Sequence, residues 1–563
     1  MKRRLLAIFL CFLAIVSTYA VAGRIELKQQ LHDYLEASQE TWNFRGAVLV
    51  ARDGKVILAS GYGFANEEFG EENTNDTKFM IGSITKQFTA SAILRLQEKG
   101  LLKVQDPINQ YLLDYPRFAG GKVTIHHLLT HTSGIPNYTE DPELLAKRTT
   151  PVSPSTLMKL VMSKPLEFEP GSKFSYSNSG YIILGAIIES VSGQSYEAFL
   201  HHEILKPSGM LNSGYARREA GLPHRADGYT VDNDRDMIAA PAISYSVLHT
   251  AGALYSTISD MLLWDKALTE STVLSSESVQ AMFTDYGYEY GYGWFMDSLY
   301  GRSHLFHGGF LDGFNTTIDR WPDDKLLVIV FSNEDEVPIK KMARGLASIC
   351  FFGRPYFFPS RKTSISTEPG CLAAYEGAYQ PGLGDIHLIM LEDDTLHIYL
   401  PGRKQDRLLP EALDSFFLLS DNTIVINFNR DNKGQVVGYE LWDEGITIQT
   451  LKLDSLRAYQ QLRLYKAQAV TQLELRAVAG TYQLESQMLD SSQVFYLEIV
   501  LENKQLYASL VGFDRIELHP CSALEFFHRT IDFRLFFTTD NSGDVINCIL
   551  EMGNASVLGH RIR

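Results

Sequence analysis

The sequence predicts an α+β protein in which a domain built on one antiparallel sheet, flanked by helices and holding a helical insert, precedes two small all-β, barrel-like modules. Three observations predict it. Two hairpin patterns lie far apart, at residues 45–63 and 307–333. The segments between them have mostly helical periodicity. Beyond residue 370 the pattern changes to short alternating strands that contain an internal repeat.

Both ends of the first domain contribute to its sheet. The first hairpin pattern has alternating apolar residues on either side of the turn signal Asp53–Gly54. The second is predicted to turn near residues 322–324. Amphipathic helices are predicted at 25–38 and 339–352, so the domain extends over residues 24–353.

Residues 354–370 have the proline, serine and charge content of a linker. After it, AAYEGAY recurs as AVAGTY, LLPEALDSFF as LHPCSALEFF and FNRDNKGQVV as FTTDNSGDVI. The last two pairs keep offsets of 110 and 109 residues, so the copies are in register. We therefore predict β modules at 371–465 and 470–563, with one buried face per strand. Their aromatic residues could line a ligand cavity, but core packing is favoured; these are Phe416, Phe417, Phe526 and Phe527.

The N-terminus has the pattern of a secretory signal peptide. Three basic residues, Lys2 to Arg4, precede the apolar run LLAIFLCFLAIV and the small residues of STYAVAG. This pattern predicts a signal peptide over residues 1–22, with an uncleaved anchor as the alternative. After cleavage no integral membrane span is expected, and the predicted location is periplasmic or secreted. The formal net charge of −16 disfavours nucleic acid as a partner.

Four cysteines follow the predicted signal peptide: Cys350, Cys371, Cys521 and Cys548. An oxidising compartment permits disulfides, and four cysteines allow three pairings, between which the sequence does not choose. The repeat equivalents of Cys521 and Cys548 are Glu411 and Tyr439. A bridge between those two cysteines would therefore be an addition to the second module alone.

The stretch FMIGSITKQFTASAIL places Ser83 and Lys86 one helical turn apart, ahead of an apolar run. Residues three apart lie on one face of a helix, so the two head groups can meet. A buried lysine favours its neutral form and can accept the proton of a serine hydroxyl, which is a poor nucleophile without such a neighbour. Alone, the S-x-x-K pattern is a weak signal that recurs by chance, and an ordinary surface helix is the favoured interpretation.

Two further stretches give this pair a chemical context. KFSYSNSGYIILGAII brings Tyr176 and Asn178 into a Y-x-N arrangement, and HGGF (307–310) places a histidine and two glycines on a strand. Together, and in this chain order, the three motifs resemble those of the class C β-lactamase and D,D-peptidase-like serine hydrolases. TIHHLLTHTSGIPNY, TAGALYSTISDMLLW and YGYGWF match the same family, so the resemblance covers residues 25 to about 350. The modules resemble the lipocalin-like barrels often appended to this family.

The resemblance implies a β-lactamase/transpeptidase-like fold and a set of roles in an acyl-enzyme reaction. Ser83 would be the nucleophile, Lys86 would help to accept its proton, and Tyr176 would relay protons and activate the deacylating water. Which of Lys86 and Tyr176 is the principal base stays open, since the two titrate as a coupled pair. No metal or cofactor is implied. His127 and His131 lie four residues apart, but Leu128 stands where a metalloprotease pattern has glutamate, so we predict a structural role for His131.

The same resemblance implies the substrate contacts. Asn178 would hydrogen-bond the substrate, and the backbone N–H groups of Ser83 and Phe310 would form an oxyanion hole. Gly308 and Gly309 would let the substrate approach the strand. His307 departs from the lysine found in many β-lactamases and is partly protonated near neutrality. We therefore expect weaker anchoring of carboxylates, which improves as the pH falls, and doubt efficient β-lactam hydrolysis.

The leading hypothesis is a periplasmic or secreted serine hydrolase. It would act through an acyl-serine intermediate on an ester, amide, D-amino-acid peptide or β-lactam bond of a small-molecule or peptide substrate, one source of which is the cell wall. The alternative is a penicillin-binding covalent acceptor or sensor that acylates with little turnover. A third hypothesis makes the β modules the working part. Oligomerisation through the modules stays open.

Overall fold

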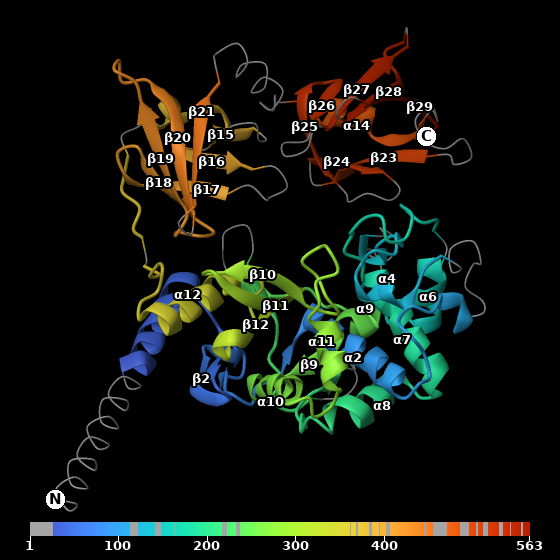
Figure 1. The fold of residues 1–563 in the computed structure, drawn as a ribbon. Helices are drawn as coiled ribbons and strands as arrows, with labels where there is room; N and C mark the ends of the chain where they lie inside the picture. Colours follow the sequence, from blue (N-terminus) through green and yellow to red (C-terminus); the bar gives the residue numbers. More distant parts are fainter. Residues whose placement is uncertain are drawn as a thin grey trace, which may run out of the picture. The chain divides into compact units, whose positions relative to one another are not determined.

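The structure is a computed structural model of the 563-residue chain. It describes residues 26–112, 122–140, 148–162, 164–216, 222–231, 237–360, 362–367, 370–381, 386–392, 394–400, 406–443, 446–453, 470–484, 495–502, 505–510, 516–527, 533–540, 542–552 and 555–562. The predicted signal peptide, residues 1–22, lies outside these ranges. The chain forms two compact units, and the change from one to the other falls between Ser360 and Arg361 (Figure 1).

The first unit contains a six-stranded antiparallel sheet in the order β10-β11-β12-β13-β1-β2. β1 (Gly46–Arg52) and β2 (Lys55–Tyr62) form the predicted first hairpin. Its turn residues Asp53 and Gly54 both have positive φ, 52° and 67°, which is the backbone geometry of a tight hairpin turn. β1 also pairs with β13 along its whole length. The two ends of the domain therefore meet in one sheet, as predicted.

The second hairpin pattern holds more sheet than the sequence predicted. Residues 307–333 contain the end of β11 and all of β12 and β13, and the predicted turn is a short 3₁₀ segment, Pro322–Asp324. A second turn at Asp312 and Gly313 separates β11 from β12, and Gly313 has a φ of 83°. The Asp-Gly signal for this turn is present in FLDGF. The strands are β10 (Phe295–Leu299), β11 (Arg302–Leu311), β12 (Phe314–Trp321) and β13 (Leu326–Ser332).

Helices cover both faces of this sheet (Figure 1). α12 (Ile339–Phe352) begins and ends as predicted, whereas the N-terminal helix extends to residue 42, beyond its predicted end. These two helices pack closely, because a side chain at Gly345 would come within 2.1 Å of the Tyr34 hydroxyl. The insert between the outer strands comprises α2 (Thr85–Glu98), α4 (Ile125–Leu129), α6 (Pro154–Met162), α7 (Asn178–Ser192), α8 (Tyr196–Leu200), α9 (Tyr245–Gly252), α10 (Ile258–Thr269) and α11 (Ser276–Met282).

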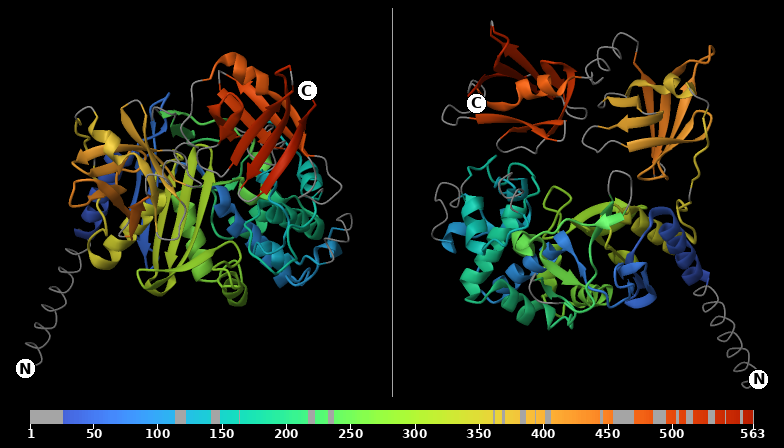
Figure 2. Two further views of the ribbon diagram at one scale, coloured as in Figure 1. Left: turned by 90° about the horizontal axis from the view of Figure 1, so that it is seen from above. Right: turned by 180° about the vertical axis from the view of Figure 1, so that it is seen from behind.

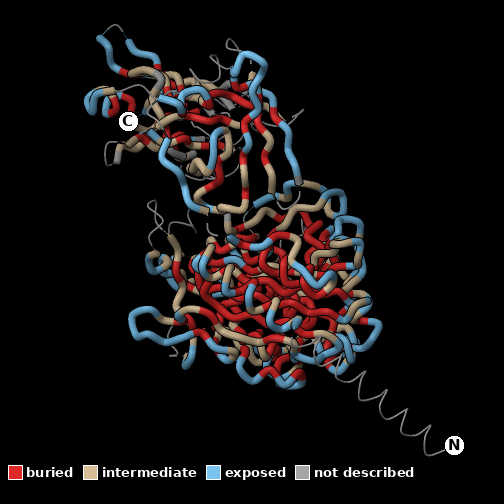
Figure 3. Tube along the Cα trace, turned by 90° about the vertical axis from the view of Figure 1, so that its left-hand side faces the viewer, coloured by how far each residue is buried: buried red, intermediate tan, exposed pale blue. Residues whose placement is uncertain are grey.

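Short strands and turns complete the first unit, and buried residues run through its sheet and the surrounding helices (Figure 3). The strands are β3 (Phe64–Asn66), β4 (Glu71–Glu72), β5 (Phe79–Met80), β6 (Gly214–Tyr215), β7 (Tyr229–Val231), β8 (Met237–Ala239) and β9 (Leu254–Ser256). Within the described part of the chain, no helix has both the length and the apolar character needed to cross a bilayer.

The second unit consists of two closed eight-stranded antiparallel barrels (Figures 1 and 2). The first is built from β14 (Gly377–Gln380), β15 (His387–Glu392), β16 (Thr395–Tyr399), β17 (Asp406–Ala412), β18 (Ser415–Leu418), β19 (Val425–Arg430), β20 (Val436–Asp443) and β21 (Ile446–Lys452). The second, after α14 (Gln472–Val478), is built from β22 (Gly480–Leu484), β23 (Phe495–Glu502), β24 (Gln505–Leu510), β25 (Ile516–Ser522), β26 (Glu525–Phe527), β27 (Phe533–Thr539), β28 (Val545–Met552) and β29 (Ala555–Arg561).

The two barrels share their internal details. Tyr379 donates to a backbone carbonyl four residues upstream at 2.6 Å, and its counterpart Tyr482 does the same at 2.8 Å. Both barrels carry a β-bulge directly after an equivalent proline, Pro410 or Pro520. The four phenylalanines considered as cavity residues are at most 3% exposed. Phe416 and Phe526 belong to the two barrel cores, whereas Phe417 and Phe527 follow them on the same strands and point to the opposite face.

The predicted linker 354–370 is divided between the two units. The Phe357 ring packs 5.9 Å from Trp42 in the first unit, whereas the N–H of Ile365 donates to the Pro410 carbonyl of the first barrel. Cys350, Cys371 and Cys548 are free thiols. No Cys521–Cys548 bridge is therefore present, and the side chain of Cys521 lies outside the described residues.

Candidate active site

Ser83 lies in a tight 3₁₀ turn, Gly82–Ile84, directly before α2. Of the residues from Phe79 to Leu94, Ser83 alone is not buried. Gly82 has a φ of 49°, and a side chain there would come within 2.9 Å of the Phe310 nitrogen. The turn therefore places Ser83 against the third-motif strand and leaves its hydroxyl accessible.

Lys86 is fully buried and its ammonium nitrogen has three partners. Nζ lies 2.9 Å from Ser83 Oγ, 2.8 Å from Asn178 Oδ1 and 2.9 Å from the Ala251 carbonyl. None of these partners is a carboxylate, and burial lowers the pKa of Lys86 well below its ordinary value. A neutral amine has two hydrogens and one lone pair. In that neutral form the amide oxygen and the carbonyl, which can only accept, would take both hydrogens, and the lone pair would face the Ser83 hydroxyl.

Tyr176 stands on the loop that leads into α7. Lys86 Nζ lies 4.9 Å from the centre of its ring. Burial raises the pKa of Tyr176 above its ordinary value, and the nearby Ser83 side chain offsets only part of that rise. The side chain is therefore a neutral phenol. Opposite shifts on Lys86 and Tyr176 separate the two groups into a base and an acid.

Asn178 is the first residue of α7 and connects the pair to a second loop. Its Oδ1 accepts from Lys86, and its Nδ2 donates to Thr139 Oγ1 at 3.1 Å. The amide nitrogen carries two hydrogens, so one N–H is left for another acceptor. The Asn178 side chain thus binds Lys86 through its oxygen. Only its remaining N–H could make the predicted contact with the substrate.

The two glycines of the third motif have different surroundings. A side chain at Gly309 would lie 2.0 Å from the Ile81 carbonyl, whereas one at Gly308 would find its nearest atoms at 3.6 Å. We had expected both glycines to let the substrate approach the strand. Gly309 instead makes room for the backbone that carries Ser83. Phe310 follows with a side chain that is 62% exposed. Its backbone nitrogen lies beside Gly82, which precedes Ser83.

His307 does not have the charge expected from the sequence. Its side chain is 2% exposed, with Nδ1 at 2.7 Å from the Gly308 carbonyl and Nε2 at 3.2 Å from the Tyr290 hydroxyl. Burial is the largest cause that lowers its pKa to about 3, with Lys86 and Lys340 as its basic neighbours. The expectation of a histidine that titrates near neutrality is therefore wrong, because the imidazole is enclosed by protein.

Sequence reasoning missed several groups that complete the site. The Ala251 carbonyl accepts from Lys86, Thr139 accepts from Asn178, and Tyr290 contacts His307. Ala251 and Tyr290 lie in stretches that match the family, TAGALYS and YGYGWF, but their contacts depend on distant chain segments. His131 has the predicted structural role, since Ser177 N–H and Tyr290 occupy its two ring nitrogens.

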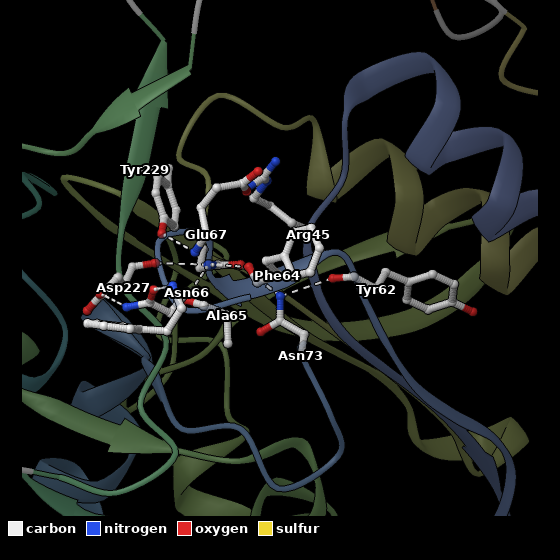
Figure 4. Close-up of polar contacts among 11 residues, drawn as sticks. Arg45, Tyr62, Phe64, Ala65, Asn66, Glu67, Asn73, Asp227 and Tyr229 are labelled. Atoms are coloured by element: carbon white, nitrogen blue, oxygen red, sulfur yellow. Dashed lines mark hydrogen bonds and ion pairs between the residues drawn. The ribbon is translucent and has the colours of Figure 1, made fainter. Parts of the chain in front are cut away.

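A cavity of about 690 Å³ opens beyond the third-motif strand. Residues 239–243 and Tyr245 form one wall, and the turn after β11 contributes Asp312 and Phe314. None of the predicted site residues lines this cavity; its lining residue nearest to them in sequence is Asp312, two residues after Phe310. Figure 4 shows polar contacts among other residues that line the cavity: the N–H of Glu67 donates to the Tyr229 hydroxyl at 2.8 Å, and Asn66 donates to Asp227 at 2.5 Å.

The sequence model of the Beta-lactamase family matches residues 31–349, more than half of the chain. The chain belongs to this family. Penicillin-binding protein 4* of Bacillus subtilis (strain 168) is 28% identical over 421 residues, covering 69% of this chain and 91% of the relative. The putative penicillin-binding protein PbpX of the same strain is 31% identical, covering 55% of this chain and 74% of its own.

A solved structure extends the likeness of this Beta-lactamase family member beyond its first unit. The octameric penicillin-binding protein homologue from Pyrococcus abyssi is 27% identical, with a TM-score of 0.55, and the match covers 75% of this chain and 99% of that one. Because 75% exceeds the share of the chain in the first unit, the match includes part of the second.

Proposed function

We propose that this chain is a serine hydrolase that works through an acyl-serine intermediate, outside the cytoplasmic membrane, on an ester, amide, D-amino-acid peptide or β-lactam bond. The observation that carries the proposal is the Lys86 amine, which is buried, lacks a carboxylate partner and lies 2.9 Å from Ser83 Oγ. The reaction uses only groups of the chain and water.

Acylation follows from this geometry. The Ser83 O–H bond breaks, its proton moves to the Lys86 lone pair, and Oγ bonds to the substrate carbonyl carbon. The carbonyl oxygen becomes an oxyanion that the N–H groups of Ser83 and Phe310 stabilise. Each donor of this kind lowers the free energy of the transition state by about 3–4 kcal/mol. The bond to the leaving oxygen or nitrogen then breaks. That atom takes the Tyr176 proton, and Tyr176 recovers a proton from Lys86.

Deacylation reverses these roles with water as the nucleophile. Water attacks the acyl carbon while its proton passes to the Lys86–Tyr176 pair, and the Ser83 oxygen leaves and regains a proton. Lys86 is the principal base in this scheme, because burial favours its neutral form and the neutral form of Tyr176 alike.

The surroundings of the site favour uncharged groups beside the scissile bond. His307 offers no positive charge, so carboxylate-bearing β-lactams lose one anchor. The cavity beyond β11 is large enough for an extended acyl group or a short peptide. By likeness to the octameric homologue, we further propose that the second unit serves in assembly.

The decisive experiment is intact-mass measurement after exposure to a fluorescent penicillin, a D-Ala-D-Ala peptide and a short-chain aryl ester. We expect an adduct on Ser83 that decays with release of product, and no adduct on Ser83→Ala. A persistent adduct with at least one of these compounds, and product from none, would favour the sensor. Product formed equally by Ser83→Ala would refute the proposal.

The cavity has its own test. Ala242 is exposed on the cavity wall, so Ala242→Trp fills space without disturbing the core. We expect KM to rise about 10-fold for long-chain aryl esters and to stay unchanged for acetyl esters, since a lost methylene contact is worth about 1–3 kcal/mol. Equal effects on both esters would exclude the cavity as an acyl subsite.

A further inference from the structure

A buried chain of hydrogen bonds connects the second motif to the third. Ser177 N–H donates to His131 Nδ1 at 3.1 Å, and His131 Nε2 lies 3.3 Å from the Tyr290 hydroxyl. That hydroxyl lies 3.2 Å from His307 Nε2, and His307 Nδ1 lies 2.7 Å from the Gly308 carbonyl. His131, Tyr290 and His307 are each at most 2% exposed.

The backbone fixes the direction of every proton in this chain. Ser177 N–H can only donate, so His131 Nδ1 accepts and its proton is on Nε2, which donates to Tyr290. The Gly308 carbonyl can only accept, so the His307 proton is on Nδ1. His307 Nε2 therefore accepts from the Tyr290 hydroxyl. One arrangement satisfies all four bonds with both imidazoles neutral.

Both ends of this chain touch groups assigned to the reaction. Ser177 stands between Tyr176 and Asn178, and the His131 ring packs against the Tyr176 ring at a centroid distance of 4.2 Å. Gly308 precedes the glycine that holds β11 against the Ser83 turn. The two motifs come from segments far apart in sequence, and the relay joins them through one tyrosine hydroxyl.

We propose that His131 and Tyr290 are positioning residues, which hold the phenol of Tyr176 and the oxyanion strand in register and keep His307 in one neutral tautomer. This inference rests on the proposed function. Protonating His131 Nδ1 would set a hydrogen against the Ser177 N–H. Protonating His307 Nε2 would set a hydrogen against the Tyr290 O–H and break that hydrogen bond. Burial of the two rings opposes both events; Lys86 is the titratable neighbour of both imidazoles, and Lys340 is a further neighbour of His307.

A matched pair of variants tests the kinetic part. Tyr290→Phe removes the central hydroxyl and leaves two buried ring nitrogens unpaired. We expect kcat for an aryl ester to fall about 10- to 100-fold with KM within about 2-fold, because misplaced groups act in the transition state. Tyr292→Phe is the control: its hydroxyl also bonds a histidine, His126 at 2.8 Å, but outside the relay. It should keep kcat within about 2-fold at a similar loss of stability.

A histidine-selective ¹⁵N NMR measurement tests the proton arrangement without any substrate. The wild-type protein should show His131 with its proton on Nε2 and His307 with its proton on Nδ1, both unchanged from pH 5.5 to 8. In Tyr290→Phe the His307 Nε2 signal should shift, because that nitrogen loses its hydrogen-bond donor. Opposite tautomers in the wild type, or equal kcat in Tyr290→Phe and Tyr292→Phe, would overturn the proposal.

The two proposals fail in different ways. Unchanged product formation by Ser83→Ala would remove the acyl-serine reaction but leave the tautomers as assigned. Reversed tautomers with normal acylation of Ser83 would remove the relay and leave the hydrolase. The double variant His131→Asn/Tyr290→Phe should lose no more than about 3-fold beyond Tyr290→Phe, since both break one chain. Multiplied losses would count against the relay.

Discussion

Two histidines on β11, three residues apart, are similarly buried, but the pKa of one is raised and the pKa of the other is lowered. His304 is 3% exposed and lies between Asp297 at 2.8 Å and Asp319 at 3.1 Å. Burial alone would lower its pKa, but the two carboxylates outweigh burial and raise it to about 9. His307 is 2% exposed, has a hydroxyl and a carbonyl as partners, and has a pKa lowered to about 3.

The contrast extends to the regions around these residues. The His304 end of the strand is held by charged pairs, including Arg320 with Asp265 at 2.5 Å. At the Ser83 end the buried groups bond only to neutral partners. A carboxylate there would raise the pKa of Lys86 and take away its lone pair. The comparison teaches that partner chemistry, rather than depth of burial, separates a structural charge from a catalytic base.

Placing a carboxylate beside Lys86 would make the Ser83 end resemble the His304 end. Of the changes considered, this substitution has the largest expected effect. In Asn178→Asp the new carboxylate keeps Lys86 protonated, so acylation of Ser83 at pH 7 should fall about 10³-fold, the usual range for loss of a general base. The rate should recover partly as the pH rises and Lys86 loses its proton. Stopped-flow acylation by an aryl ester between pH 6 and 10 measures this.

The uncharged variant Asn178→Leu is the control for that experiment. It removes the same hydrogen bond without adding charge, so Lys86 stays neutral and the rate should not gain a new dependence on pH. A flat pH profile in Asn178→Asp, or the same steep profile in both variants, would contradict the account of Lys86 as a neutral base.

The sequence predicted the elements better than their contacts. The first hairpin, the helix α12 at the end of the first domain and the two repeated modules follow from local periodicity and turn signals, and the structure has all of them. The turn at Asp312 and Gly313 went unnoticed because the apolar run around it was treated as one strand. The pairing of β1 with β13 needed an argument about both ends of the domain.

Within the candidate site, the motifs placed Ser83, Lys86, Tyr176 and Asn178 around one centre, and the structure brings these four together. The charge of His307 could not be predicted. It depends on Tyr290 and on enclosure by other segments, neither of which is visible in an H-x-G pattern. A motif specifies the residue type, whereas burial and the neighbouring groups determine the pKa of that residue.

Removing a carboxylate from the His304 end has the second-largest expected effect. The pKa of His304 is raised above its unfolded value, so its contribution to stability is complete below about pH 6.5 and is lost as the pH rises through about 9. The shift corresponds to about 3 kcal/mol. In Asp319→Asn most of this should disappear at pH 6, and the difference from wild type should shrink by pH 10.

Denaturant unfolding followed by tryptophan fluorescence checks this, because four of the five tryptophans lie in the first unit and Trp442 alone lies in a barrel. Ser298→Ala, an exposed change on the neighbouring strand, serves as the control and should leave the free energy of unfolding within about 0.5 kcal/mol at both pH values. A wild-type-to-Asp319→Asn difference that stays constant from pH 6 to pH 10 would show that His304 is not charged in the folded protein.

The smallest expected effect concerns carboxylate-bearing substrates at the His307 end. Since the pKa of His307 is about 3, KM for such a substrate should not change with pH between 5 and 8 through this residue. The exposed Lys340, whose side chain passes beside Gly308, is the cation that remains. Lys340→Ala should raise KM only about 2- to 5-fold for a carboxylate-bearing substrate and leave an uncharged ester unaffected, since an exposed charge is worth about 1 kcal/mol or less. If KM instead fell as the pH dropped toward 6 in both wild type and Lys340→Ala, His307 would have to be charged, and the contrast between the two histidines would be lost.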